Sequence, residues 1–125
     1  MKEQIVICRI NQSHGFLHAV NECSDDSPNV TVISKDVSTP DGLAVDWVHG
    51  RLFWTDTGLD RINVINLSNL RRRVLFDKGL DQPRAIAVDP IAGLIFWSDW
   101  GHQARIERAD MDGEHRVVSA LVLFT

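Results

Sequence analysis

The sequence predicts an all-β protein, a partial β-propeller of about two and a half to three four-stranded antiparallel blades. One stretch occurs twice, 43 residues apart, and each copy divides into four short β-rich segments separated by turns. Repeats of this period and content are typical of propeller blades. No segment spaces its apolar residues at intervals of three and four, so an amphipathic helix is disfavoured. Three blades are too few to close a ring.

The repeated stretch begins at a proline and ends at a glycine. Its first copy is Pro40–Asp46 followed by Arg51–Gly58, and its second is Pro83–Asp89 followed by Gly93–Gly101. The positions that match across the 43-residue period are Pro40 and Pro83, Asp46 and Asp89, Trp54 and Trp97, Asp56 and Asp99, and Gly58 and Gly101.

Each copy is predicted to form one blade. We place the first blade at residues 38–79 and the second at residues 80–119. In the first copy we expect strands within 43–46, 51–55, 61–65 and 73–76. Leu52–Thr55 carries large side chains on both faces, as a sheet stacked between two other sheets requires. The small residues Ala44, Ala85 and Ala87 suit an inner strand, where blades converge.

Residues 1–37 lack the repeat and are interpreted as a degenerate partial blade. Strands are expected at 4–10, 16–21 and 30–33, where β-branched residues gather between turns. By their order along the chain, Phe16–Asn21 is compared with Arg61–Asn66, and Val30–Val37 with Arg73–Leu80. Residues 120–125 are taken as a truncated tail.

Composition excludes several classes of protein. The 125 residues are 44% hydrophobic, with a net charge of −4 and a pI near 5.6, so no broad basic face is available for nucleic acid. No apolar run approaches the length of a membrane helix, and no direct membrane insertion by this segment is expected. The start of the chain does not resemble a signal peptide.

Two kinds of modification are open. Cys8 and Cys23 are the only cysteines, and they either form a disulfide in an oxidising compartment or remain thiols in a reducing one. N-glycosylation sequons begin at Asn11, Asn29 and Asn66. No cysteine or histidine spacing suggests a metal site, and no cofactor is expected.

Phe53–Asp56 and Phe96–Asp99 resemble the Tyr-Trp-Thr-Asp signature of the LDL-receptor class B repeats. Asp41–Asp46, Trp100-Gly101 and Met111–Gly113 also stand where that family has similar residues. The resemblance implies a six-bladed propeller on the extracellular side of a cell membrane, in an endocytic or signalling receptor or co-receptor. It also implies a protein ligand or neighbouring receptor modules as partners. A matrix protein of nidogen type is the alternative.

The signature residues are expected to be structural. Trp54 and Trp97 supply large apolar area between sheets, and Asp46, Asp56, Asp89 and Asp99 accept hydrogen bonds in turns. No nucleophile elbow, P-loop or dinucleotide fingerprint occurs, so the chain is predicted not to be an enzyme. A calcium-dependent lactonase-like propeller is the enzymatic alternative.

Four residues are candidates for ligand binding: Trp100, Arg105, His49 and His102. Trp100 is an aromatic side chain in a turn, where it can anchor a partner. Histidine titrates at endosomal pH, so His49 and His102 are candidates for pH-dependent release of a ligand. Exposed histidines without such a role are the alternative.

The open faces of a three-blade piece lead to the first prediction. Because uncovered sheet faces and edges favour association, the isolated chain should be poorly stable or oligomeric. Sedimentation velocity over a concentration series, followed by thermal unfolding, checks this. A monomer with a sharp, concentration-independent melting transition would contradict it.

Overall fold

The structure, a computed structural model, describes residues 4–9, 17–20 and 29–121. These residues contain strands and turns and no helix, which confirms the predicted all-β class. The eleven strands are β1 Ile5–Arg9, β2 Leu17–Val20, β3 Asn29–Ile33, β4 Pro40–Asp46, β5 Arg51–Asp56, β6 Arg61–Asn66, β7 Arg72–Phe76, β8 Pro83–Asp89, β9 Leu94–Asp99, β10 Arg105–Asp110 and β11 Val117–Leu121.

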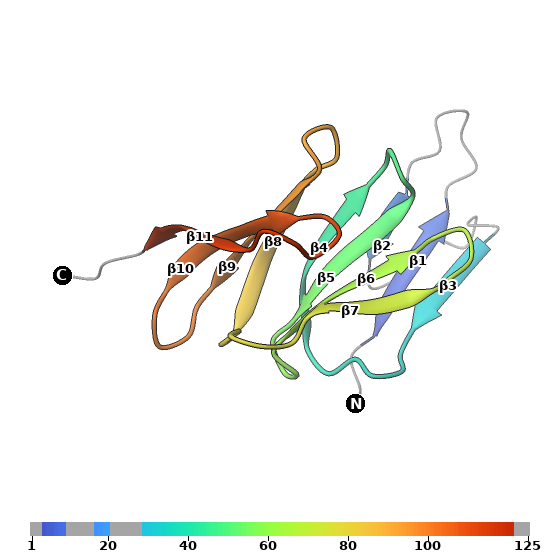
Figure 1. Ribbon diagram of the computed structural model, residues 1–125. Coiled ribbons are helices and arrows are strands. Elements are labelled where there is room, and N and C mark those ends of the chain that lie inside the picture. The colour runs from blue at the N-terminus through green and yellow to red at the C-terminus, as the bar shows by residue number, and fades with distance from the viewer. Residues whose placement is uncertain (1–3, 10–16, 21–28, 122–125) are drawn as a thin grey trace.

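Two four-stranded antiparallel sheets cover the repeated part of the chain (Figure 1). One has the order β4-β5-β6-β7 and the other β8-β9-β10-β11, so that every strand pairs with its neighbour in sequence. Each sheet is the simple meander predicted for a propeller blade. β11 continues to Leu121, past the predicted blade limit at 119.

A third sheet of three strands has the order β2-β1-β3. β1 lies between the other two, so the comparison of Phe16–Asn21 with Arg61–Asn66 was wrong. In the repeated sheets β6 pairs with β7, whereas β2 pairs with β1 and not with β3. β1 is rich in β-branched residues and hydrogen-bonds along both edges, which makes it the central strand. The assignment of residues 1–37 to a partial blade stays a prediction.

The side chains of β5 explain how the sheets stack. Leu52 and Trp54 lie in one hydrophobic core with Ile5 and Ile33 of the three-stranded sheet. Phe53, on the opposite face of β5, lies in a second core with residues of sheet β8–β11. Leu52–Asp56 is buried along its whole length, which is the two-sided packing predicted from sequence.

The inner strands β4 and β8 contact one another where the two blades converge. A Cβ atom built on Gly42 would lie only 2.2 Å from the carbonyl oxygen of Arg84. The Thr55 hydroxyl accepts a hydrogen bond from the Gly42 N–H (2.8 Å) and donates one to the same Arg84 carbonyl. Two blades therefore share a polar seam that leaves no room for a side chain at residue 42.

The second prediction concerns Gly42 and its repeat counterpart Ala85. Gly42→Ala should destabilise the chain by about 1–3 kcal/mol, because the new methyl group overlaps the backbone of the next blade. Urea unfolding measures the change. Ala85→Val is the matched control: Ala85 is exposed on the face of sheet β8–β11 that no other described residue covers. Equal losses in both variants would contradict the seam.

Candidate functional site

The turns of the two blades gather at two opposite ends of the sheets (Figure 1). The Trp100 end consists of turns 57–60 and 100–104 and connections 34–39 and 77–82. The His49 end consists of turns 47–50, 67–71, 90–93 and 111–116. Backbone hydrogen bonds from Leu67 N–H to the Gly50 carbonyl and from Met111 N–H to the Gly93 carbonyl hold the His49 end together.

Asp56, which ends β5, fixes the connection that enters its blade. Its carboxylate accepts hydrogen bonds from the N–H groups of Ser38 (2.8 Å) and Thr39 (3.0 Å) in connection 34–39. It also accepts one from the Leu59 N–H (3.0 Å), across the β5–β6 turn. One buried carboxylate thus satisfies three backbone donors and joins two segments of the Trp100 end.

Asp99 has the corresponding role in the second blade. It accepts hydrogen bonds from Asp81 N–H (2.8 Å) in connection 77–82 and from Gly101 N–H (3.0 Å) in the β9–β10 turn. It is 2% exposed, so these partners compensate for its lost hydration. The geometry of both signature aspartates is that of structural hydrogen-bond acceptors.

The other two predicted aspartates lie at the His49 end. Asp46 is fully buried and accepts hydrogen bonds from His49 and Arg51 side chains and from turn N–H groups. Burial opposes its ionisation, but the hydrogen bonds and charge of these partners lower the pKa of Asp46 below its ordinary value. Asp89 is exposed and accepts one hydrogen bond from Ala92 N–H.

Trp54 and Trp97 are buried between sheets, and each lies beneath an arginine, Arg72 at the start of β7 or Arg116 in the turn directly before β11. The Arg72 guanidinium carbon is 4.9 Å from the Trp54 ring centroid, and that of Arg116 is 5.5 Å from Trp97. Both distances fall in the range of cation–π attraction. Each tryptophan therefore contributes apolar contact to a core and also positions a cation.

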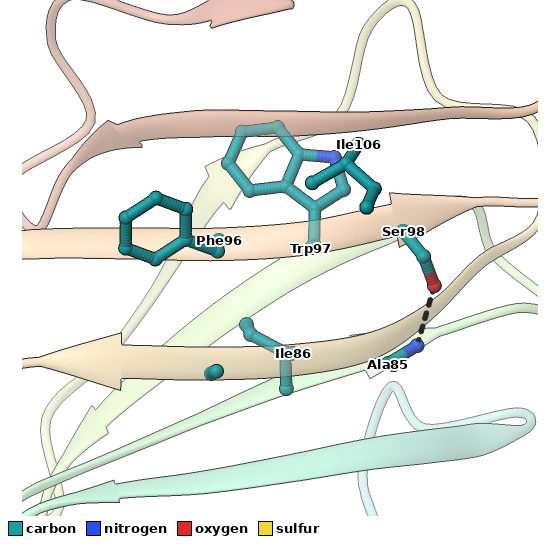
Figure 2. Close-up of a pocket in the computed structure, with 7 residues that line it drawn as sticks. Ala85, Ile86, Phe96, Trp97, Ser98 and Ile106 are labelled. Carbon is teal, nitrogen blue, oxygen red and sulfur yellow. Dashed lines mark hydrogen bonds between the residues drawn. The ribbon is translucent and has the colours of Figure 1, made fainter. Parts of the chain in front are cut away.

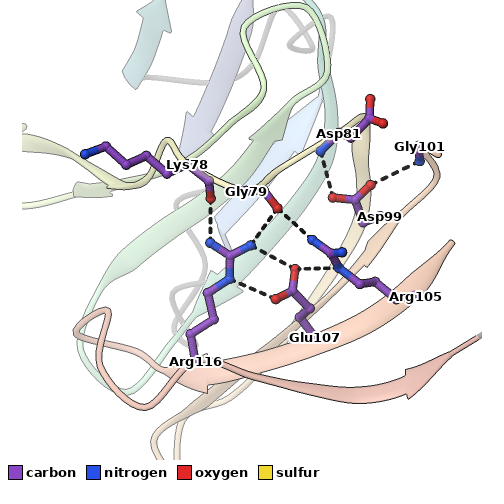
Figure 3. Close-up of polar contacts among 8 residues, drawn as sticks. All are labelled: Lys78, Gly79, Asp81, Asp99, Gly101, Arg105, Glu107 and Arg116. Carbon is purple, nitrogen blue, oxygen red and sulfur yellow. Dashed lines mark hydrogen bonds and ion pairs between the residues drawn. The ribbon is translucent and has the colours of Figure 1, made fainter. Parts of the chain in front are cut away.

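Arg116 belongs to a buried ion cluster shown in Figure 3. Its guanidinium donates to both oxygens of Glu107 at 2.9 Å, and Arg105 donates to the same carboxylate at 3.2 Å. Both arginines also donate to the carbonyl of Gly79, and Arg116 to that of Lys78. The cluster attaches β10 and β11 to the connection that enters their blade.

Glu107 is the centre of this cluster. Its burial raises the pKa of the carboxyl, but hydrogen bonds and charge from Arg116, and then from Arg105, outweigh this effect. The net result is a pKa below the ordinary value, so the carboxylate is ionised at neutral pH. Two arginines around one buried carboxylate form a strong contact, but one that leaves little of Arg105 available to a ligand.

The structure separates the four candidate ligand residues. Trp100, His102 and Arg105 lie together at the Trp100 end, whereas His49 lies at the opposite end. Trp100 is 55% exposed, and His102 is held through its backbone N–H by Asp81. Arg105 is committed to Glu107 and Gly79. Of the four, Trp100 and His102 are exposed and neither side chain has a hydrogen-bond partner among the described residues.

Histidines at the His49 end bind aspartates of their own turns. His49 Nδ1 lies 2.9 Å from Asp46, and His115 Nδ1 lies 2.6 Å from Asp110. The hydrogen bond and charge of Asp110 raise the pKa of His115 above its ordinary value. The part of the chain that the structure describes brings neither His49 nor His115 together with His102.

The sequence did not predict the partners of Glu107 or the exposure of Ile91. The Glu107–Arg116 pair depends on the register of β10 and β11, which sequence spacing alone did not reveal. Trp47 and Ile91 are exposed in turns of the His49 end, Ile91 by 89%. Trp47 follows Asp46 directly and Ile91 follows Asp89 after Pro90, so the repeated aspartates mark the turns in which both residues lie.

The structure describes only some of the residues predicted to be glycosylated or to form a disulfide. The Asn66 side-chain oxygen accepts hydrogen bonds from the N–H groups of Ser68 and Asn69 in the β6–β7 turn. Asn11 and Cys23 lie outside the described residues. The strands that contain Cys8 and Asn29 are described, but their side chains are not.

The described residues offer no cluster of three or more histidine, cysteine, aspartate or glutamate side chains placed to hold a metal ion. In the same ranges no helix is long and apolar enough to cross a membrane.

These features define a class of protein, the β-propellers whose blades are joined by a buried tryptophan and an aspartate at the end of the second strand. Comparison with known sequences gives the family. The low-density lipoprotein receptor repeat class B matches residues 50–90 and 93–120. The chain belongs to this family, which confirms the predicted resemblance.

Two human relatives illustrate the relationship. The chain is 44% identical over 110 residues to low-density lipoprotein receptor-related protein 8. The aligned region covers 88% of the chain and 11% of the relative. The chain is 41% identical over 88 residues to low-density lipoprotein receptor-related protein 5-like protein, covering 70% of the chain and 35% of the relative. The chain thus spans a minor part of each relative.

Solved structures agree on the fold. A chain in the nidogen/laminin complex superposes with a TM-score of 0.73 at 37% identity, covering 87% of this chain and 41% of that one. The aldose sugar dehydrogenase of Streptomyces coelicolor gives a TM-score of 0.56 at 16% identity, covering 68% and 30%. At that identity the second likeness concerns the fold alone.

The third prediction tests the ion cluster. Glu107→Gln should lower the free energy of unfolding at pH 7 by about 2–4 kcal/mol, because two partly buried arginines lose their counter-charge. The folded-state pKa of Glu107 lies below its unfolded value, so its contribution is complete above the unfolded pKa and is lost as the pH falls through the folded one.

Urea unfolding between pH 7 and pH 3 checks both parts of this prediction. The difference between wild type and Glu107→Gln should shrink as the pH falls below about 4.3, the ordinary glutamate value. Glu114→Gln, in an exposed turn of the same blade, is the control and should leave stability unchanged. A difference that stays constant with pH would contradict the role of the carboxylate charge.

Proposed function

We propose that the chain is part of a non-catalytic, protein-binding propeller in the extracellular region of an LDL-receptor-like endocytic or signalling receptor. The observation that carries this is family membership together with 44% identity to a receptor-related protein. The second support is an exposed tryptophan, Trp100, in a turn of the Trp100 end.

The Trp100 end suits a protein partner because its surface combines apolar and charged side chains near the inner strands. Leu59 and Trp100 are exposed in the β5–β6 and β9–β10 turns. Arg84 and Asp41, both about half exposed, form an ion pair of 3.7 Å at the starts of β8 and β4. An exposed aromatic side chain beside charged groups is the usual composition of a binding hot spot.

The repeat supports the choice of Trp100. Its counterpart Thr57 donates a hydrogen bond to the Pro83 carbonyl (2.9 Å) and so helps to join the two blades. Tryptophan at position 100 cannot reproduce that bond through a hydroxyl group. It instead presents a large aromatic side chain beside the uncovered face of sheet β8–β11, and aromatic side chains are enriched in protein interfaces.

A nidogen-type matrix protein is the second candidate, favoured by the superposition on the nidogen/laminin complex. Cell-surface biotinylation of the protein in its native cells separates the two. Labelling of an intact, detergent-extracted membrane protein supports the receptor, whereas recovery only in the detergent-insoluble matrix supports the alternative. Both candidates share a protein-binding propeller, so the next prediction applies to each.

The fourth prediction is that Trp100→Ala weakens binding to a protein ligand at least about tenfold, as expected for loss of an aromatic anchor. The complete propeller-bearing protein is immobilised for surface plasmon resonance. The probes are the laminin fragment of the nidogen-type complex and fractionated serum proteins.

Ile91→Ala, at the His49 end, is the matched control and should bind as the wild type does. Loss of binding in Ile91→Ala with Trp100→Ala unaffected would move the binding surface to the other end. Absence of micromolar binding to every probe would contradict the proposed function.

A further inference from the structure

Each four-stranded sheet has two arginines and one buried polar residue at positions that match in the two sheets. The residues are Arg61, Asn63 and Arg72 in sheet β4–β7, and Arg105, Glu107 and Arg116 in sheet β8–β11. Strand register establishes the match. Asn63 lies opposite Trp54 and Glu107 opposite Trp97, the two tryptophans beneath the arginines of β7 and the β10–β11 turn.

The two arginines above the tryptophans make the same contacts with the backbone. Arg72 donates to the carbonyls of Lys35 and Asp36 in the connection that enters its blade, just as Arg116 donates to Lys78 and Gly79. Arg116 additionally points its Nε and Nη2 groups at Glu107. Among the described residues, no carboxylate takes that place beside Arg72.

Asn63 makes the difference between the blades. It is fully buried, and neither its Oδ1 nor its Nδ2 has a hydrogen-bond partner among the residues that the structure describes. A buried amide without partners is costly, and in native proteins it commonly indicates a bound water or ion. The Trp54 indole N–H also lacks a partner, but so does that of Trp97, so the indole does not distinguish the blades.

The carboxylate contact that Arg116 has and Arg72 lacks points to an anion rather than to water. Burial lowers the pKa of Arg72; Asp36 and Asp56 act against this effect, and Arg61 adds to it. Asp56 already accepts three backbone hydrogen bonds. With asparagine in the place of glutamate, no described carboxylate makes a hydrogen bond or ion pair with Arg72, although Asp36 and Asp56 lie close enough to act on its charge.

We propose that a small monovalent anion, chloride or a free carboxylate of formate size, binds between Arg72 and Asn63 in the space that the Glu107 carboxylate fills in the next blade. The free N–H edge of Arg72 and the Asn63 Nδ2 group donate to it, and Arg61 adds electrostatic attraction. The site lies between sheet β4–β7 and connection 34–39, and it does not depend on the proposed protein binding.

The fifth prediction follows from linkage between ligand binding and folding. In the full chain, chloride is titrated at constant ionic strength against the bulky sulfonate anion of HEPES, which does not fit the site. The melting temperature should rise by roughly 3–6 °C for each tenfold increase in chloride above its dissociation constant. Excess ³⁵Cl NMR line width reports the bound ion directly. Replacing chloride by formate distinguishes the two sources.

Asn63→Glu supplies the carboxylate from the chain itself. It should raise the melting temperature in HEPES and abolish both the response to chloride and the excess line width. Arg71→Ala, an exposed neighbour that changes the net charge by the same amount, should retain both. Should Asn63→Glu not fold, Asn63→Gln fills the same space without charge and must also remove the excess line width.

Two results would overturn the proposal. One is an identical response to chloride in wild type and in the Asn63 variants, since the effect would then come from elsewhere. The other is no response of the wild type to chloride or formate, which would mean that the cluster holds water alone.

Discussion

The fold depends on burying both faces of β5 at once. A four-stranded meander with two apolar faces has no stable form in water by itself, because a single sheet leaves one of them exposed. Trp54 and Phe53 point to opposite sides of the strand, and each meets a different neighbouring sheet. Stacking of sheets is therefore imposed by the sequence of one strand.

Stacking of apolar faces does not by itself fix the position of one sheet relative to the next. Polar contacts to the connections that precede each blade fix it. Asp56 and Asp99 bind the connections that enter their blades, and Arg72 and Arg116 bind carbonyls of the same connections. In each connection the aspartate thus accepts from backbone N–H groups, and the arginine donates to backbone carbonyls. Thr55 then fixes the distance between the inner strands.

The repeat made most of this fold predictable. A 43-residue period with a Trp-Thr-Asp or Trp-Ser-Asp segment determined the class, the strands of both blades and the burial of Leu52–Thr55. The order β2-β1-β3 was not predictable in the same way, since residues 1–37 have no second copy to set their register. The Glu107 cluster was missed because it joins residues of one strand, the turn that follows it and a connection distant in sequence.

The open face of sheet β8–β11 shows what a further sheet must supply. Phe96, Ser98 and Ile106 line a shallow apolar pocket there (Figure 2), whereas their counterparts Phe53, Thr55 and Ile62 are fully buried by the next blade. Ser98 accepts a hydrogen bond from Ala85 N–H, as Thr55 does from Gly42. Its hydroxyl proton is thus available for a carbonyl of the covering strand, the bond that Thr55 makes to Arg84.

Comparison of the two blades separates the requirements of the architecture from residues that have other roles. Where a position has the same chemistry in both copies, as at Thr55 and Ser98, the stacking of sheets explains it. Trp100 replaces the hydroxyl group with which Thr57 reaches the next blade, and Asn63 replaces the carboxylate that pairs with two arginines in the other copy. Because the contacts shared by the two blades account for neither replacement, we propose binding as their explanation.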